Sequence, residues 1–378
     1  MTDTVRAPHV LLPRPGVDLS RWAVVACDQF TSQMAYWQQA EALVGDAPST
    51  LRLVYPEAYL LRAGEPDRVP AIHEAMARYL REGVFAAPRE GFILVERTTR
   101  AGRRLGLMVE IDLAAYDFSE GATSLIRPTE GTILERIPPR VRVRKGAPLE
   151  CPHVMLLADD PARTLIEPLY EKRGGYEALY DVTLMLGGGR LRGWAVPAEE
   201  NGAIFAAMRA LPSLAREDPI LFAVGDGNHS LATARQCYLD NPERAPRYAL
   251  AEVVNLYDES LVFEPIHRLI EGVDAAALHA AAAAQGVSLE HGDVRQVQPF
   301  LDRWLPKGAG VDYIHGSQAL AELSARPGFC GICLAPIDKS TLFPSLSGGR
   351  VLPRKAFSMG EAEEKRYYME CRALHAGQ

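Results

Sequence analysis

One segment constrains the fold of this chain more than any other, residues 220–235. The apolar run at 220–224 predicts a buried strand, the polar turn at 225–230 contains two glycines, and residues 231–235 open a helix. A strand, a tight turn and a helix N-terminus in succession make an anion site. The first backbone N–H groups of a helix lack intrahelical partners, and the helix dipole adds positive charge. The segment therefore predicts a turn suited to phosphate.

The same turn carries two ionisable side chains. Asp226 supplies a carboxylate and His229 an imidazole, so the turn can move a proton or hold a metal ion. We take both as candidate catalytic residues and Asp226 as the candidate metal ligand. The candidate phosphate contacts in the turn are Gly225, Gly227, Asn228 and Ser230. The alternative is an ordinary βα turn, whose glycines serve only a positive φ and whose polar side chains form a rim.

Length and charge limit the classes of protein that this chain can represent. A chain of 378 residues exceeds the usual size of one core, so we expect more than one compact unit. The net charge of −7 argues against a broad nucleic-acid-binding face. No apolar run approaches the ~18 residues of a membrane span, and the first residues lack a signal-peptide core. We therefore expect a cytoplasmic protein, and the six scattered cysteines fit a reducing compartment.

Apolar periodicity and turn residues predict the other elements. We expect strands at 22–30, 91–96, 105–112, 153–158, 182–186, 192–196, 247–256 and 261–268. Helices are expected to end at Gly45 and Gly83, and to span 199–211 and 274–286. Cys330 and Cys333 have the spacing of half a zinc site, but their apolar surroundings favour a buried strand. We divide the chain into an N-terminal α/β portion at 1–120, a core at 121–270 and a C-terminal α/β portion with a closing helix at 271–378.

A second candidate region lies at 124–136. Glu130 stands in a loop where it can face a cleft as a general base, and Arg127 and Arg136 can hold an anion nearby. The alternative is an exposed helix start in which Thr129 caps the helix, Glu130 complements its dipole and the arginines are solvated.

A basic run follows this region. Arg140, Arg142 and Arg144 alternate with a period of two, which predicts an extended strand with three guanidinium groups on one face. Such a strand either meets an anionic partner or forms a solvated edge that charge protects from aggregation.

A third candidate region lies near the C-terminus. Ser358 and Glu361 have the spacing of a capping box, which predicts a helix from Ser358 to about residue 373. Arg354 and Lys355 precede its positive end, an unfavourable arrangement unless an anion is bound, so we include them as candidate phosphate contacts. The alternative is a surface loop with solvated basic side chains.

A histidine–arginine pair ends the strand expected at 261–268. His267 is either a hydrogen-bonded core histidine or a second proton-transfer group. We include His267 and Arg268 among the candidate ligand-binding residues.

The turn and four other blocks resemble a bacterial and archaeal family of unknown function whose members are often described as ParB-like. The turn Asp-Gly-Asn-His-Ser is similar to that family's Asp-Gly-His-His-Arg loop. The other similar blocks lie at 27–33, 133–140, 263–268 and 357–360. The resemblance implies an α+β protein with a ParB/sulfiredoxin-like core and flanking α/β portions.

A more distant resemblance connects the turn with free-serine kinases on the ParB/sulfiredoxin fold. Those enzymes hold nucleotide phosphates on a similar loop, with an upstream glutamate as base. Asp226, Gly227 and His229 match that loop, and Glu130 is the upstream acid that the resemblance implies. Asn228 and Ser230 depart from it. Because Ser230 replaces an arginine, a fixed cation is missing, and Arg127, Arg136 or Arg354 would have to replace it.

Together these features predict a nucleotide- or phosphate-binding protein that uses ATP or ADP with Mg²⁺. Its reaction would be phosphoryl transfer to a small hydroxylated metabolite, as in a small-molecule kinase. The alternative is a non-catalytic ParB-like module that uses nucleotide as a switch and has a macromolecular partner. The acidic balance and the lack of a recognisable helix-turn-helix favour a small-molecule partner over nucleic acid.

Overall fold

The computed structural model describes residues 4–60, 64, 66–243 and 245–374. Contacts divide the chain into two compact units. Unit 1 comprises Met1–Pro128, Thr132–Leu261 and Glu361–Gln378, and unit 2 comprises Thr129–Gly131 and Val262–Gly360. This grouping is coarser than the three portions expected from the sequence, which stay a prediction. Across the described ranges, none of the helices has the length and apolar character that a membrane crossing requires.

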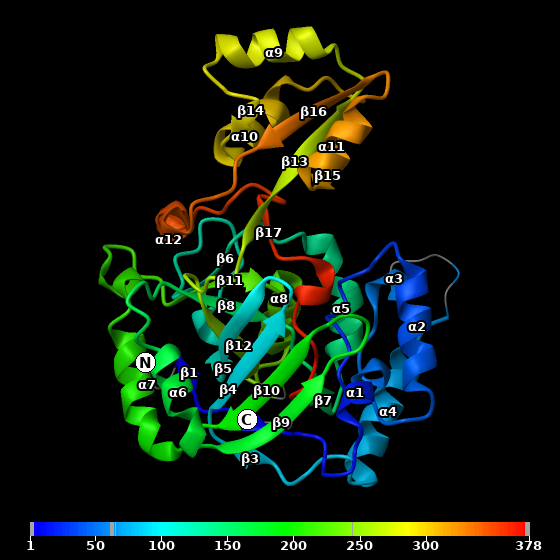
Figure 1. Cartoon of the computed structure of the whole chain (residues 1–378), viewed down its shortest axis with the longest axis vertical. Coiled ribbons are helices and arrows are strands. Elements are labelled where there is room, and N and C mark those ends of the chain that lie inside the picture. Colours follow the sequence, from blue (N-terminus) through cyan, green and yellow to red (C-terminus); the bar gives the residue numbers. More distant parts are fainter. Residues whose placement is uncertain (1–3, 61–63, 65, 244, 375–378) are drawn as a thin grey trace. The chain divides into compact units, whose positions relative to one another are not determined.

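The chain is a mixed α/β protein with several sheets, and unit 1 is built on the largest sheet of the described residues (Figure 1). Its strand order is β6-β11-β8-β12-β5-β4-β10-β9, and β1 also pairs with β5. The bounds are β1 Val5–Arg6, β4 Ile93–Thr99, β5 Gly102–Asp112, β6 Ile126–Pro128, β8 Met155–Ala158, β9 Glu177–Thr183, β10 Arg190–Ala195, β11 Phe222–Asp226 and β12 Tyr248–Asn255. β11 runs parallel to β6 and antiparallel to β8, so the strand before the candidate turn is held on both sides.

Both faces of this sheet are buried. Along β4, Ile93 and Val95 pack into one core, whereas Leu94 packs into the other, as the two-residue period of a strand requires. The second core also holds Phe222 of β11 and Leu231, which follows the turn. The turn is therefore anchored at both ends by residues of one core. A ParB/sulfiredoxin-like arrangement of this core stays a prediction.

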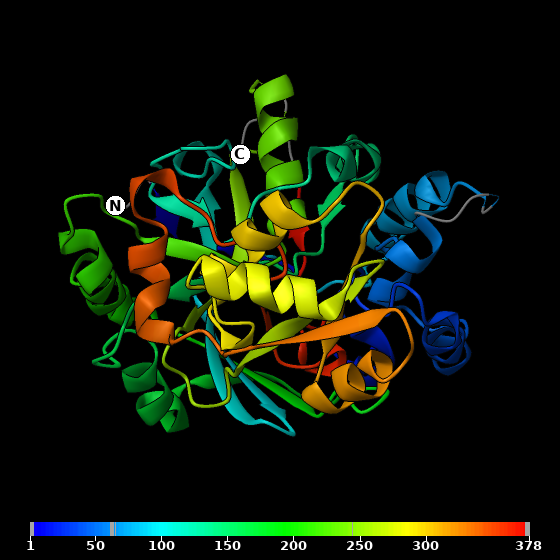
Figure 2. The same cartoon turned by 90° about the horizontal axis from the view of Figure 1, so that it is seen from above.

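Helices cover the two faces of the sheet in unit 1. α1 Leu19–Trp22, α2 Met34–Val44, α3 Glu57–Leu60 and α4 Val69–Arg81 contribute to the first core, and α6 Glu167–Lys172, α7 Asn201–Arg209 and α8 Asn228–Asp240 to the second. Figure 1 and Figure 2 both show α2 and α4 on the opposite side of the unit from α6 and α7. Because α8 follows β11 directly, the predicted strand–turn–helix is confirmed.

The basic run is helical, which corrects the predicted strand. α5 Ile137–Arg144 carries Pro138 in its first turn, where proline suits a helix start. A helix repeats every 3.6 residues instead of every two, so Arg140 and Arg144 share one face. Arg142 lies off that face and pairs with Asp67 at 2.6 Å.

The strand predicted at 22–30 is also wrong. The Asp18 side chain accepts a hydrogen bond from Ser20 N–H at 3.0 Å and caps the one-turn helix α1, which ends at Trp22. The buried residues that follow form only an isolated bridge, between Val25 and Tyr367. The apolar run 22–26 thus indicated burial and not a strand. Its bridge partner, Tyr367, lies far along the chain.

The predicted helix from Ser358 to residue 373 is wrong as well. Ser358 lies in the strand β17 Phe357–Met359, and the capping box forms between Glu361 and Glu364 on a short 3₁₀ turn. The helix whose positive end was to meet Arg354 and Lys355 does not exist. The argument for an anion beside these two residues therefore loses its premise.

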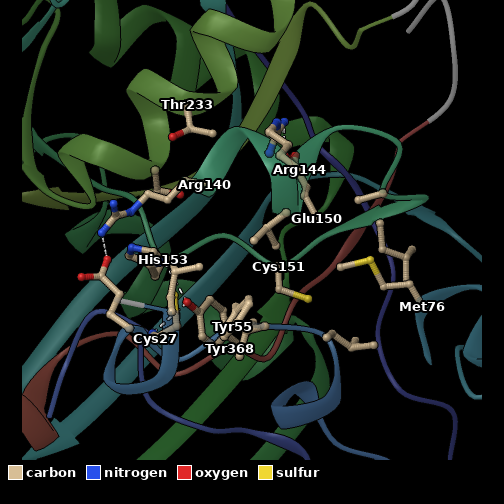
Figure 3. Close-up of a pocket in the computed structure, with 18 residues that line it drawn as sticks. Cys27, Tyr55, Met76, Arg140, Arg144, Glu150, Cys151, His153, Thr233 and Tyr368 are labelled. Atoms are coloured by element: carbon tan, nitrogen blue, oxygen red, sulfur yellow. Dashed lines mark hydrogen bonds and ion pairs between the residues drawn. The ribbon is translucent and has the colours of Figure 1, made fainter. Parts of the chain in front are cut away.

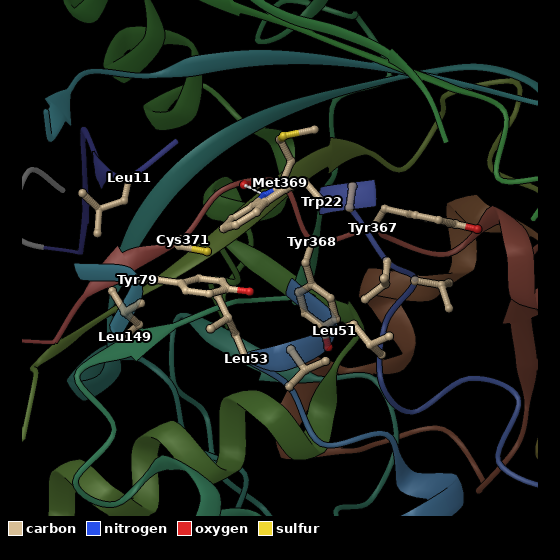
Figure 4. Packing of buried hydrophobic residues seen from close by; sticks show 14 of the residues in the cluster. Leu11, Trp22, Leu51, Leu53, Tyr79, Leu149, Tyr367, Tyr368, Met369 and Cys371 are labelled. Carbon is tan, nitrogen blue, oxygen red and sulfur yellow. Dashed lines mark hydrogen bonds between the residues drawn. The ribbon is translucent and has the colours of Figure 1, made fainter. Parts of the chain in front are cut away.

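After this turn the C-terminal segment runs extended through the first core. Tyr368 N–H donates to Val24 O at 2.9 Å. Tyr367, Tyr368 and Met369 are buried together with Trp22, whose indole N–H donates to Met369 O at 3.1 Å (Figure 4). A segment buried on all sides has no polar face to give to solvent, which an amphipathic helix requires. Further along, this segment forms the short strand β18 Arg372–Ala373, which pairs antiparallel with β7 Leu149–Glu150.

Unit 2 is built on its own sheet, with the order β14-β16-β13-β15 and β17 paired to β13. The strands are β13 Phe263–Glu271, β14 Glu290–Gly292, β15 Gly310–His315 and β16 Phe329–Leu334, and the helices are α9 Ala275–Ala284, α10 Val294–Trp304, α11 Ser317–Ser324 and α12 Leu342–Ser345. The strand predicted around Cys330 and Cys333 is confirmed as β16, and both thiols are free.

Candidate ligand-binding site in unit 1

The turn between β11 and α8 depends on a glycine. Gly227 has φ +77° and occupies the N-cap position of α8, with no side-chain cap. A Cβ at this position would lie 3.0 Å from Val154 Cα and 3.3 Å from His153 Cδ2. Both the positive φ and this close approach exclude a side chain. The turn is thus packed directly against the segment that carries His153.

Two oxygen atoms of the turn are buried without a hydrogen bond in the described structure, Asp226 Oδ2 and Asn228 Oδ1. The other Asp226 oxygen accepts from Gly227 N–H at 3.0 Å. Lys365 Nζ lies 3.6 Å from Asp226 Oδ2, an ion pair beyond hydrogen-bond distance. Buried polar atoms without partners are rare and costly. The turn therefore offers two oxygen acceptors to a ligand.

His229 has a different role from its neighbours in the turn. Its Nε2 accepts a hydrogen bond from Ile133 N–H at 3.3 Å. Its own carbonyl accepts from Thr233 Oγ1 at 2.7 Å within α8. Because Nε2 is an acceptor here, the ring proton belongs to Nδ1 in the neutral form.

A cavity of about 120 Å³ lies beside the first turns of α8 (Figure 3). α8 contributes Ser230 and Thr233 to its wall, and α5 contributes Arg140 and Arg144 from the one face that these two arginines share. The other lining residues come from α3, α4, α5, β7, the loops and the C-terminal segment: Cys27, Leu53, Val54, Tyr55, Glu57, Leu60, Met76, Val143, Ala147, Leu149, Glu150, Cys151, His153 and Tyr368. The cavity thus adjoins the turn through α8 and His153.

Ion pairs neutralise the charges of the cavity wall. Arg140 pairs with Glu57, and Arg144 pairs with Glu150 at 2.6 Å. Both carboxylates are almost fully buried. The wall therefore presents paired charges of both signs to a polar ligand.

Three polar side chains form a chain at one end of the cavity. His153 Nδ1 lies 2.8 Å from Tyr368 Oη, and its Nε2 lies 3.6 Å from Asp28 Oδ2. Cys27 N–H donates to Tyr368 Oη at 3.0 Å, and Gln29 donates to Asp28 Oδ1 at 3.0 Å. Figure 3 shows His153, Tyr368 and Cys27 together at this end.

Burial and neighbouring charge act in opposite directions on the pKa values of His153 and Asp28. Burial lowers the pKa of His153, but the charge and hydrogen bond of Asp28 outweigh it, and the pKa is raised above its ordinary 6.5. Burial raises the pKa of Asp28, but His153 outweighs it, so the net shift is downward. Burial, followed by the charge of Asp28, raises the pKa of Cys27 to about 12. The Cys27 thiol is thus protonated near neutral pH and is no nucleophile.

The arginines expected near the turn are occupied or exposed. The Arg127 side chain is buried, and its Nη1 donates to Asp218 Oδ2 at 2.6 Å. Arg136 lies exposed at the start of α5, and its carbonyl accepts from Arg140. Lys365 is the cation that the structure brings next to Asp226.

Gly225 lies in β11 of unit 1. The remaining predicted site residues belong to unit 2, where they lie near one another. Glu130 Oε2 accepts from Lys355 N–H at 2.9 Å. Arg268 is fully buried, and it donates to Gln298 Oε1 at 2.6 Å and to Arg354 O at 3.1 Å. His267 Nδ1 accepts from Leu334 N–H at 3.1 Å.

Sequence reasoning missed four polar residues at and beside the cavity. His153 and Tyr368 line it, Asp28 contacts His153, and Lys365 contacts Asp226. These residues lie far apart in the chain. The only available signal was the proximity of Asp28 to a buried apolar run. As for a metal, no group of three or more His, Cys, Asp or Glu side chains in the described ranges has the arrangement to hold one.

The chain matches a family model described as "Protein of unknown function (DUF1015)" over residues 11–371. This protein belongs to the DUF1015 family. No curated protein matches it. Among solved structures, a free serine kinase in complex with AMP has 11% identity and a TM-score of 0.37, covering 71% of this chain and 92% of that chain. A conserved hypothetical protein from Pyrococcus furiosus has 11% identity and a TM-score of 0.34, covering 71% of this chain and 95% of that chain. Likenesses of this size carry no argument about activity.

Proposed function

We propose that this DUF1015 protein binds a nucleotide with Mg²⁺ at the β11–α8 turn and transfers its terminal phosphoryl group to a small hydroxylated molecule. The observation that carries the proposal is the N-terminus of α8, which no side chain caps, beside two buried oxygens without a hydrogen bond, Asp226 Oδ2 and Asn228 Oδ1. A helix N-terminus donates backbone N–H groups to phosphate.

The chemistry of these donors fits a magnesium–nucleotide. Mg²⁺ takes oxygen ligands, keeps several waters and is held through one or two carboxylates together with substrate phosphates. Asp226 and Asn228 would face the ion or its waters, and Lys365 would balance phosphate charge. The ion would neutralise charge on the phosphates when bound. The small number of acidic residues at the turn agrees with an ion that arrives on the nucleotide.

The size of the cavity separates two subsites. An engineered cavity of about 150 Å³ accommodates benzene, so about 120 Å³ admits a molecule of only a few heavy atoms. The base and ribose of a nucleotide would remain outside the cavity, with the phosphates on the turn. A small hydroxylated acceptor would occupy the cavity.

The experiment compares two serine-to-aspartate variants by thermal shift. Ser230 lies in the first turn of α8, where a carboxylate complements the helix dipole but repels phosphate. We expect S230D to keep or gain stability without ligand and to lose at least tenfold in affinity for MgATP. S317D makes the same change in the first turn of α11 in unit 2 and should bind MgATP as the natural chain does.

The ligands are ATP, ADP, CTP and GTP, each with Mg²⁺, with Mg²⁺ alone and inorganic phosphate as references. A ligand at about 100 times its dissociation constant adds about 2.7 kcal/mol to the free energy of unfolding. No shift at millimolar nucleotide, or equal binding by S230D and the natural chain, would overturn the proposal. Binding without transfer of radiolabelled phosphate would leave the nucleotide switch.

Glu130 is the base that the resemblance implies for this reaction. If Glu130 acts as that base, E130Q loses turnover and keeps nucleotide binding, because it removes the base and retains the shape. If E130Q keeps turnover, the base lies elsewhere. The same radiolabel assay measures this variant.

A further inference from the structure

We propose that Tyr368, His153 and Asp28 form a proton relay that accepts the proton of a small alcohol bound in the cavity. The inference rests on the proposed function, because the alcohol is the phosphoryl acceptor. It assigns the base to unit 1, where the turn itself lies, in place of Glu130, so under this proposal E130Q keeps turnover. Tyr368 is then a catalytic residue, and Asp28 positions His153.

The hydrogen-bond inventory leaves one position on the tyrosine for a ligand. Tyr368 Oη accepts from Cys27 N–H at 3.0 Å and can donate its own proton to His153 Nδ1 at 2.8 Å. A hydroxyl oxygen has two acceptor lone pairs. The second can accept a hydrogen bond from an alcohol in the cavity that Tyr368 lines.

The tautomer of His153 follows from its two neighbours. With Nδ1 accepting from Tyr368, the ring proton is on Nε2, which faces Asp28 Oδ2 at 3.6 Å. Proton uptake at Nδ1 gives an imidazolium whose Nε2–H remains directed at a carboxylate. This arrangement stabilises the charged ring as a carboxylate stabilises a catalytic histidine.

The charged groups around His153 favour uptake of a proton. Asp28 and Asp226 raise the pKa of His153, while burial and Arg140 lower it, and the net shift is upward. Lys365 acts on both carboxylates, since it pairs with Asp226 and lowers the pKa of Asp28. Tyr368 has a pKa well above its ordinary value, chiefly through burial. The tyrosine therefore passes a proton on and does not hold a negative charge.

Atoms and protons balance in this step. The alcohol oxygen forms a bond to the terminal phosphorus of the nucleoside triphosphate, and the bond from that phosphorus to the bridging oxygen breaks, leaving the nucleoside diphosphate. The alcohol proton moves to Tyr368 Oη, and the tyrosine proton moves to His153 Nδ1. General acid–base groups of this kind contribute about 10²–10⁴-fold to a rate.

Two adjacent tyrosines give a matched pair of variants. Tyr367 is buried beside Tyr368, but its hydroxyl donates to Met185 O at 3.1 Å and does not line the cavity. With radiolabelled MgATP and ethanolamine, ethylene glycol or glycolate as acceptors, we expect Y368F to lose about 100-fold or more in kcat. Y367F should stay within about twofold, and both should bind MgATP equally.

The positioning role of Asp28 has its own readout. In D28N we expect kcat to fall about tenfold and the acid limb of its pH profile to move to lower pH, because the imidazolium loses its carboxylate. Long-range proton–nitrogen spectra of ¹⁵N-histidine protein, assigned with H153Q, should show His153 protonated on Nε2 and titrating above 6.5 in the natural chain.

The outcomes separate the relay from the proposed function. If MgATP binds and is turned over but Y368F is as fast as Y367F, the relay is overturned and the proposed function stands. A His153 titration at or below 6.5 overturns the relay as well. If the natural chain neither binds nor turns over MgATP, the proposed function fails and the relay falls with it.

Discussion

Two buried histidines, one in each unit, show how similar burial can lead to opposite chemistry. His153 in unit 1 and His267 in unit 2 are 7% and 3% exposed. The pKa of His153 is raised, because Asp28 outweighs the burial that acts against it. The pKa of His267 is lowered by burial and then by its neighbour Arg268. The sign of the adjacent charge therefore decides which ring takes up a proton.

The two imidazole rings also differ in their surroundings, in agreement with their opposite pKa shifts. His153 contacts a cavity, and its partner Tyr368 retains an acceptor position. His267 Nδ1 accepts from the Leu334 backbone N–H in the sheet of unit 2, and each side-chain nitrogen of Arg268 beside it donates to a carbonyl or a side-chain amide. We infer that His267 and Arg268 maintain the structure of unit 2. Substitutions at these two residues and at the His153 site can test this contrast.

The largest effect is expected from Arg268→Ala. This change removes a fully buried guanidinium and leaves Gln298 and the Arg354 carbonyl without their donor. Each buried acceptor left without its donor costs about 1–3 kcal/mol, and the cavity left by a large buried side chain adds to this loss. Hydrogen exchange of β13 amides in urea measures the loss. We also expect the pKa of His267 to rise toward its ordinary value.

The matched control is Arg326→Ala, which removes an exposed arginine of the same unit. Its effect should lie within about 0.5 kcal/mol. Protection of β13 that is equal in the two variants would show that Arg268 is not structural and would break the contrast.

A smaller effect is expected from Gly227→Ala in unit 1. The new Cβ would meet Val154 Cα at 3.0 Å and would stand at φ +77°. Positive φ costs an L-residue about 1–3 kcal/mol, and the turn must also move away from His153. We expect thermal unfolding at lower temperature and weaker MgATP binding.

Gly202→Ala is the control for this change. Gly202 lies in α7, its φ is not positive, and a Cβ added there would meet no heavy atom within 4 Å. Alanine there should stabilise the protein by about 0.5–1 kcal/mol. If G227A were as stable as G202A, the tight packing of the turn on His153 would be disproved.

The sequence predicted the turn and not the site around it. The strand and helix at 220–235 followed from a local apolar run, two glycines and a helix start, all of which act within a few residues. The candidate site combines His153 and Tyr368, which line the cavity, with Asp28 beside His153, and the three meet only after the sheet has formed. Their contacts span more than a hundred residues, and no local pattern encodes them.

The wrong elements have a related cause. Alternating charge at Arg140, Arg142 and Arg144 matched a strand, but Pro138 had already fixed a helix start. The capping-box spacing of Ser358 and Glu361 was present without a helix, because the segment that follows is buried on all sides. In the C-terminal segment, tertiary burial outweighed local propensity.

The smallest effect, and the most direct test of the contrast, is the pH dependence of stability in Asp28→Asn. The pKa of His153 is raised in the folded state, so its contribution is fully present below the unfolded pKa of about 6.5. It is lost as pH rises through the folded pKa. The lowered pKa of Asp28 contributes above about 3.9 and is lost as pH falls. The natural chain should thus exceed D28N in stability most between about pH 4 and 6.5, with the difference narrowing at higher pH. Each unit of altered pKa is worth about 1.4 kcal/mol.

Urea unfolding across this pH range measures the difference in the free energy of unfolding, with H267Q as the comparison. Because a lowered histidine pKa disfavours folding once pH falls below 6.5, H267Q should lose least, relative to the natural chain, at low pH. Parallel pH curves for D28N and the natural chain would contradict the ion pair and, with it, the distinction between the two histidines.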